Sequence, residues 1–148
     1  SRVGARVLPK VLAGKPAQVL GDIDVKHTWT YPIDVARLMK IVASDSRAWG
    51  KAWHVPSNEA KTQNEVVSEL ASAAGVTNPK LSSVPTVIWN LIALFNPLVR
   101  ALKETAYQMQ RPYILDDSAA RETFGMQPTP WNQILNDVVA EMKASLKK

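Results

Sequence analysis

The sequence contains no cysteine, which excludes disulfide bonds, thiolate metal sites and cysteine nucleophiles. This absence fits a reducing compartment, so we expect a cytoplasmic protein. The six glycines are far apart, which excludes both the dinucleotide-binding glycine fingerprint and the P-loop. The two histidines, His27 and His54, have no carboxylate or cysteine partner at metal-ligand spacing. We therefore expect no metal site and no cofactor-binding residues in this chain.

Long hydrophobic runs are also absent. The longest apolar stretch, residues 84–102, is interrupted by Pro85, Asn90, Asn96, Pro97 and Arg100. A membrane-spanning helix needs about 20 predominantly apolar residues, and no apolar segment follows a basic start as it does in a signal peptide. We expect no membrane association, and we interpret residues 84–102 as a buried or ligand-covering helix.

Charge of one sign does not form a compact stripe in this sequence. The net charge is +5, but the basic residues are dispersed and cluster only near the two ends. Because no compact basic stripe with interleaved aromatic residues is present, we expect no nucleic-acid partner; a helical DNA-binding domain would rest on net charge alone. With 148 residues, of which 46% are apolar, the chain is large enough for one globular domain with its own core.

Residues 27–36 are the most informative stretch that is present. Threonine and aromatic residues alternate over 28–31, as in a half-buried strand. Pro32 fits the first turn of a helix because its φ is fixed and it has no N–H to leave unpaired. Asp34 follows near the positive end of the helix dipole, and apolar residues continue at helical spacing. We predict a strand over 27–31 and a helix over 32–44.

Elsewhere the pattern predicts more helices than strands. The helix over 62–75 has the clearest ends, because Thr62 and Glu65 form a capping box and Gly75 suits the C-terminus. Thr129 is the expected cap of the last helix. We predict further helices over 2–13, from 85 onward with a break at 96–97, over 118–125 and over 129–145, and short strands over 17–20, 51–55 and 80–84.

A few short strands do not make a strong sheet by themselves. We therefore expect these strands to complete a sheet whose other strands lie elsewhere. The sequence also begins at Ser1, without methionine, and enters a helical pattern at once. We expect the chain to be part of a longer protein.

No self-sufficient catalytic set is recognisable, since neither Gly-x-Ser-x-Gly nor Tyr-x-x-x-Lys occurs. The carboxylates of Asp34, Asp116 and Asp117 fit either acid–base chemistry or helix capping, and we favour capping. The tryptophans stand next to apolar positions, so we expect them in the core. His27 fits two roles, a polar group that faces a ligand at a strand start or a surface histidine.

Several of these segments resemble one family when taken in order. They include His-Thr-Trp-Thr-Tyr followed by Asp-Val-Ala within 27–36, Trp-Gly-Lys-Ala-Trp-His-Val-Pro at 49–56, and Asp-Asp-Ser, Phe-Gly and Pro-Thr-Pro between 116 and 130. Over about residues 2–140 the chain resembles the C-terminal portion of the NAD-dependent epimerase/dehydratase family, the extended short-chain dehydrogenase/reductases.

The resemblance implies a helix-rich α/β fold, the C-terminal part of a Rossmann-type protein whose main nucleotide-binding sheet is largely missing here. Residues 1–148 would form one substrate-binding region, with residues of about 27–55 supplying the last strand and helix of the nucleotide-binding fold. The glycine-rich loop and catalytic Tyr-x-x-x-Lys of the family lie upstream. The parent would use NAD or NADP on a small-molecule substrate, and this chain alone would be inactive.

The resemblance also implies where the substrate binds. In family members that act on sugar nucleotides, the position of His27 is commonly an arginine that touches the substrate phosphate. The histidine therefore favours a smaller or less anionic carbonyl or alcohol substrate. The apolar helix of the family shapes the substrate pocket, which assigns that role here to Trp89, Leu91, Ile92, Leu94 and Phe95.

A second interpretation remains open, in which the chain is a non-catalytic interaction or oligomerisation module. In either case we expect self-association, because strand edges and apolar surface would be left uncovered. The helix over 84–102, or strand edges, would then pair between copies.

Overall fold

The computed structural model describes residues 4–19 and 21–146. Helices dominate this part of the chain, and the only regular sheet within it has two strands. The elements, in order, are α1 (Gly4–Leu12), β1 (Ala17–Val19), α2 (Pro32–Ser44), η1 (Ser46–Ala48), α3 (Gln63–Ala74), β2 (Leu81–Ser83), α4 (Thr86–Phe95), α5 (Pro97–Glu104), η2 (Ala106–Met109), α6 (Ser118–Phe124) and α7 (Trp131–Ser145).

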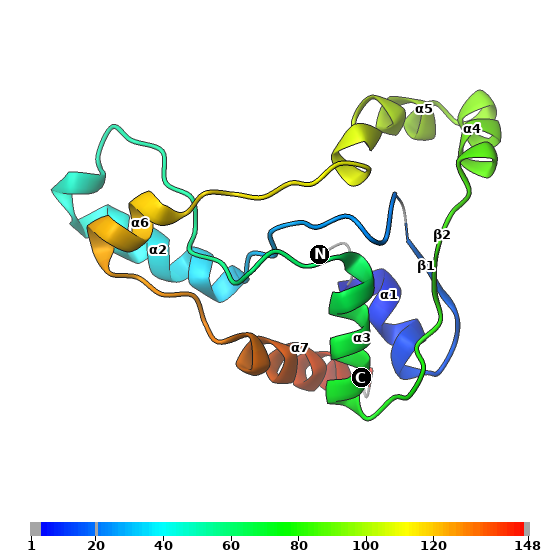
Figure 1. Cartoon of the computed structure of the whole chain (residues 1–148), viewed down its shortest axis with the longest axis horizontal. Coiled ribbons are helices and arrows are strands. Elements are labelled where there is room, and N and C mark those ends of the chain that lie inside the picture. The colour runs from blue at the N-terminus through cyan, green and yellow to red at the C-terminus, as the bar shows by residue number, and fades with distance from the viewer. Residues whose placement is uncertain (1–3, 20, 147–148) are drawn as a thin grey trace.

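The hydrophobic core lies where α1, α3 and α7 pack together beside the two strands (Figure 1). The strands β1 and β2 pair in parallel, with Ala17 opposite Leu81 and Val19 opposite Ser83. The core is formed by buried side chains of α1, β1, α3 and α7, namely Val7, Leu8, Val11, Ala17, Val19, Val66, Val67, Leu70, Ala71, Leu135 and Val139.

Local sequence signals explain the ends of α3. The Glu65 N–H donates to the Thr62 hydroxyl at 3.0 Å, and the Thr62 N–H donates to the Glu65 carboxylate at 2.7 Å, which completes the predicted capping box. At the other end Gly75 has a φ of 81°, a left-handed conformation that glycine adopts without steric cost.

The predicted strands over 27–31 and 51–55 do not form. In the first segment only His27 makes bridges, one antiparallel to Lys61 and one parallel to Tyr113. The backbone N–H groups of residues 52–55 donate to no other described residue. A strand exists only when a neighbour shares its backbone hydrogen bonds, and the described part of the chain offers neither segment such a neighbour along its length.

The helices α4 and α5 form an arm at one end of the molecule (Figure 1). They are separated at Asn96, whose extended conformation precedes Pro97, as the sequence predicts. The helix α4 packs mainly against α5. No helix in the described residues is long and apolar enough to cross a bilayer.

The chain is open in shape, with long extended segments between its helices (Figure 1). Its accessible surface is 9675 Å², whereas a compact monomer of this mass exposes about 7,500 Å². This chain therefore exposes about 2,000 Å² more surface than a compact protein of the same mass.

Candidate functional site

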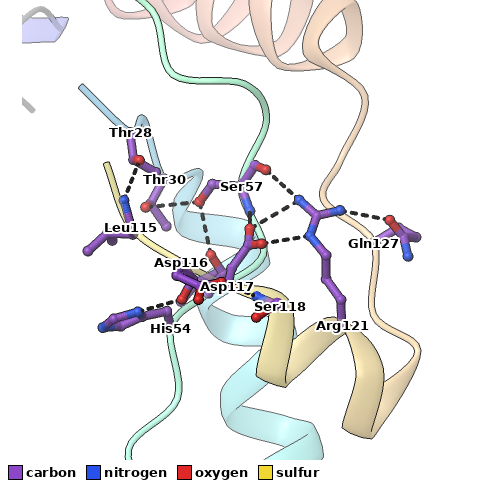
Figure 2. A network of polar contacts seen from close by, with 11 residues as sticks. Thr28, Thr30, His54, Ser57, Leu115, Asp116, Asp117, Ser118, Arg121 and Gln127 are labelled. Atoms are coloured by element: carbon purple, nitrogen blue, oxygen red, sulfur yellow. Dashed lines mark hydrogen bonds and ion pairs between the residues drawn. The ribbon is translucent and has the colours of Figure 1, made fainter. Parts of the chain in front are cut away.

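Three extended segments meet beside the N-terminus of α6 (Figure 2). The Leu115 N–H donates to the Thr28 hydroxyl at 2.9 Å, and the hydroxyls of Thr30 and Ser57 lie 3.2 Å apart. Residues from three distant parts of the sequence are thereby joined. We call this region, with Asp117 and Arg121, the junction.

An ion pair forms the centre of the junction. Arg121 Nε donates to Asp117 Oδ1 at 2.7 Å, and the Ser57 N–H donates to Asp117 Oδ2 at 2.6 Å. Burial alone would raise the pKa of the Asp117 carboxyl, but the hydrogen bonds from Arg121 and Ser57 outweigh it and hold this pKa below its usual value. The bond to Asp117 likewise raises the pKa of Arg121. Both side chains are therefore charged at neutral pH.

The remaining donors of Arg121 reach further segments. Its Nη2 donates to the Ser57 carbonyl at 2.6 Å, and its Nη1 donates to Gln127 Oε1 at 2.8 Å. The hydrogen bonds of Asp117 and Arg121 thus go to other groups of the protein. The pair holds segments together and is not available as an acid or base.

A cavity of about 370 Å³ opens beside this pair. Among the side chains that line it, Lys26 and Glu59 form a weak, solvent-exposed ion pair at 3.9 Å. These groups can hydrogen-bond polar parts of a ligand, but the Ser57 hydroxyl in the lining donates to the Val55 carbonyl at 3.0 Å and not to a base that would activate it. Nor do the described residues contain a group of three or more metal-ligating side chains.

A second buried carboxylate joins α2 to the segment before α7. Asp34 has 1% of its surface exposed and accepts hydrogen bonds from the Thr129 N–H at 2.9 Å and the Thr129 hydroxyl at 2.7 Å. Arg37, which is exposed, donates to it at 2.7 Å. Together these contacts fix the start of α2 against the start of α7.

Helix capping was therefore the wrong interpretation for two of the three aspartates. Asp34 and Asp117 make no side-chain cap, and Thr129 bonds to Asp34 and not to α7. Only Asp116 bonds its own helix start, through the Ser118 N–H at 3.0 Å, which lowers the pKa of its carboxyl. Acid–base roles gain no support, because Asp34 and Asp117 accept hydrogen bonds from several protein donors and Asp116 is exposed at the surface.

The structure places His27 in the interior, with 8% of its surface exposed, and not at an open strand start. Its Nδ1 lies 3.1 Å from the Val25 carbonyl, and its Nε2 lies 2.9 Å from the Gln108 carbonyl in η2. The ring therefore connects η2 to the segment around residues 25–27. Contact between His27 and a substrate remains a prediction.

The helix α4 carries the other predicted substrate contacts. Leu91, Ile92, Leu94 and Phe95 are exposed, with fractions from 43% for Ile92 to 84% for Phe95. The backbone of Trp89 belongs to α4, but its side chain lies outside the described part. Neither His27 nor α4 lines any of the cavities described for this part of the chain.

The tryptophans divide between core and surface. Trp29 and Trp131 pack against the core, as predicted, and Trp53 packs edge-on against Phe124 with ring centroids 4.7 Å apart. Trp49, in contrast, is 66% exposed. The prediction that the tryptophans lie in the core is therefore wrong for Trp49.

Sequence reasoning missed Ser57 and Arg121, and it assigned Thr129 to the cap of the last helix and not to Asp34. One signal was available, since Asp117 and Arg121 stand four residues apart in a helical segment, the spacing of a favourable ion pair. Nothing in the local sequence marks the bond of Ser57 to Asp117 or of Thr129 to Asp34, because these partners lie 60 or more residues away.

No protein-family model and no curated protein sequence matches this chain. Among solved structures it is similar to UDP-glucuronic acid 4-epimerase from Bacillus cereus in complex with NAD, with a TM-score of 0.64 and 16% identity, over 96% of this chain and 38% of the epimerase. It is also similar to a partial-consensus L-threonine 3-dehydrogenase, with a TM-score of 0.62 and 17% identity, over 95% and 40% of the two chains.

The chain thus spans about two fifths of the length of these enzymes. At such low identity the likeness concerns the fold alone. This protein has the fold of part of a Rossmann-type NAD-dependent epimerase and of part of a threonine dehydrogenase.

Proposed function

We propose that these residues form the substrate-binding part of a cytoplasmic NAD(P)-dependent epimerase, dehydratase or reductase. The observation that carries this proposal is the fold likeness over nearly the whole chain to an NAD-bound epimerase and to a dehydrogenase. The family resemblance of residues 27–36 and 116–130 supports the same assignment from the sequence.

The order of elements around α2 adds a second line of support. Residues 28–31 and 52–55, which were predicted as strands and have no regular structure in this chain, stand before α2 and after η1. A strand, a helix and a second strand in this order form the repeating unit of Rossmann-type sheets. The unpaired amides of the second segment are what such a strand shows before its neighbours are in place.

The residues present do not fit a cofactor site of their own. A dinucleotide pyrophosphate is held by the backbone amides of a glycine-rich loop at a helix N-terminus. The glycines of this sequence are dispersed, and each of α2, α4 and α7 has proline at or beside its start, which removes one N–H. We assign NAD or NADP to another part of the parent protein.

The substrate contacts are proposed for α4 and for His27. Trp89, Leu91, Ile92, Leu94 and Phe95 are apolar, and α4 carries no charged residue, so this helix suits the uncharged part of a small carbonyl or alcohol substrate. For His27 to reach a substrate, its contact with the Gln108 carbonyl has to open.

Steady-state kinetics of the parent protein test this function. NADH and NADPH oxidation would be followed with a panel of small aldehydes and ketones. We expect Phe95→Ala to raise KM about tenfold, the effect of losing about 1.4 kcal/mol of contact, without changing the dissociation constant for NADH. Met39→Ala, at an exposed apolar position on α2, is the matched control. A parent that binds neither cofactor would contradict the proposal.

A non-catalytic interaction module is the second candidate function. The exposed apolar side chains of α4 favour it, because monomeric proteins rarely leave such a surface uncovered. A parent protein without cofactor binding, in which α4 lies in a protein interface, would support this alternative.

A further inference from the structure

A cavity with an apolar interior lies between α7 and the segment that leads into α2. It has a volume of about 540 Å³ and is bounded by α1, α3, α7 and residues 29–33. Pockets for small molecules usually enclose about 300–1,000 Å³ and combine a mainly apolar lining with a few polar groups. Neither His27 nor α4 lines this cavity, so it is separate from the substrate contacts proposed above.

The deepest side chains of the cavity belong to the hydrophobic core. Leu8, Val66 and Leu70 line it, and each has 5% or less of its surface exposed. These side chains offer no hydrogen-bonding group. The interior therefore suits the hydrocarbon part of a ligand.

Three aromatic side chains, those of Trp29, Tyr31 and Trp131, also line the cavity and are half-buried. Aromatic faces attract ammonium groups, because the electron density of the ring is concentrated on its faces. The Trp131 ring already interacts with one cation, since Lys61 Nζ lies 5.5 Å from its centroid. Lys61 does not line the cavity, and its charge is balanced by Glu69 at 2.8 Å. These walls therefore suit a cationic ligand.

Two carboxylates of α7 add negative charge at the rim. Glu141 is exposed and is the only charged residue among the described residues that line the cavity. One turn earlier, Asp137 accepts a hydrogen bond from the Tyr31 hydroxyl at 3.1 Å. Burial raises the pKa of Tyr31, and the bond to Asp137 and the charges of both carboxylates raise it further. Neither carboxylate forms an ion pair with another described residue.

We propose that this cavity binds a small molecule with an apolar body and a primary ammonium group. The apolar body lies against the core side chains and the aromatic walls. The ammonium group donates hydrogen bonds to the Glu141 carboxylate and to the Tyr31 hydroxyl oxygen. A neutral ligand leaves the charge of Glu141 unpaired, and an anionic ligand is repelled by it. The ligand class is therefore an alkylamine or arylalkylamine.

Titration of this chain with hexylamine, hexanol and hexanoate at constant neutral pH tests the proposal. The three probes share the hexyl-sized apolar body and differ in charge. Heteronuclear NMR of the indole N–H groups reports both affinity and place, since Trp29 and Trp131 line the cavity and Trp49 does not. We expect hexylamine to shift Trp29 and Trp131 but not Trp49. It should bind about tenfold more tightly than hexanol, and hexanoate should bind more weakly than hexanol.

Two matched variants test the role of the rim charge. Glu141→Gln and Glu122→Gln change the net charge equally and replace exposed side chains, but only Glu141 lines the cavity. Glu141→Gln should raise the dissociation constant for hexylamine about tenfold and leave that for hexanol unchanged. Glu122→Gln should change neither. Circular dichroism establishes that both variants are folded.

Four results would overturn the proposal. They are shifts of Trp29 and Trp131 with none of the three probes, equal affinities for hexylamine and hexanol, tighter binding of hexanoate than of hexylamine, and equal effects of Glu141→Gln and Glu122→Gln. The titrations require neither the parent protein nor its cofactor, so these results leave the proposed function to its own test.

Discussion

The buried carboxylate of Asp34 gives the sharpest stability prediction. It accepts two hydrogen bonds from Thr129, at 2.9 Å and 2.7 Å, in a region closed to solvent. Replacing Asp34 by alanine leaves the Thr129 N–H and hydroxyl buried without their acceptor. Hydrogen bonds to charged groups contribute about 1.5–3 kcal/mol each, and unpaired buried polar groups are costly.

We expect Asp34→Ala to lower the free energy of unfolding by about 3 kcal/mol. For a chain of this size each kcal/mol shifts the melting temperature by about 2–4 °C, so the expected drop is about 6–12 °C. Thermal unfolding followed by circular dichroism, with urea titration at constant temperature, measures both quantities.

Arg37→Ala is the matched control for this prediction. It removes the exposed partner of Asp34 and leaves both bonds to Thr129 in place. The Arg37 side chain is 49% exposed, so water replaces part of its contact with Asp34, and we expect Arg37→Ala to lower the melting temperature less than Asp34→Ala does. If Asp34→Ala and Arg37→Ala had equal, small effects, the buried contact would not stabilise the fold and the reasoning would be refuted.

Three further stability predictions concern other parts of the chain. Gly21→Ala should lower the melting temperature more than Gly50→Ala. Both glycines have φ above +65°, a conformation that costs alanine about 1–2 kcal/mol. Of the two, only Gly21 would place the added Cβ 2.6 Å from a backbone oxygen in η2. Because folding lowers the pKa of the Asp117 carboxyl, its contribution to the free energy of unfolding is complete above about pH 5 and is lost as the pH falls. Between pH 5 and 3 the free energy of unfolding of Asp117→Asn, measured in urea, should therefore fall less than that of the unaltered chain. His27→Ala should lower the melting temperature more than His54→Ala, since the first ring is buried, with a nitrogen that donates to a backbone carbonyl of a distant or neighbouring residue, and the second ring is exposed. Equal melts would restore the surface interpretation of His27.

The helices were predictable where their signals are local. Pro32 marks the start of α2, Thr62 and Glu65 fix the start of α3, and Asn96-Pro97 separates α4 from α5. Each signal acts within one helical turn, so neighbouring residues are enough to read it.

The failures concern features that depend on distant partners. The segment 51–55 has the composition of a strand but lacks a neighbouring strand in the described chain. Asp34 looked like a residue at a helix start, yet its bonds go to Thr129, 95 positions away. Such pairings are set by the tertiary fold, and a single sequence does not display them.

Hydrogen exchange at residues 52–55 tests most directly whether this chain completes an NAD-binding sheet. In the isolated chain these amides donate to no described residue and should exchange rapidly. In the parent protein with NAD bound, a strand at this position should share its backbone hydrogen bonds with a neighbour, and the same amides should be protected. Rapid exchange of residues 52–55 in both proteins would contradict the proposal.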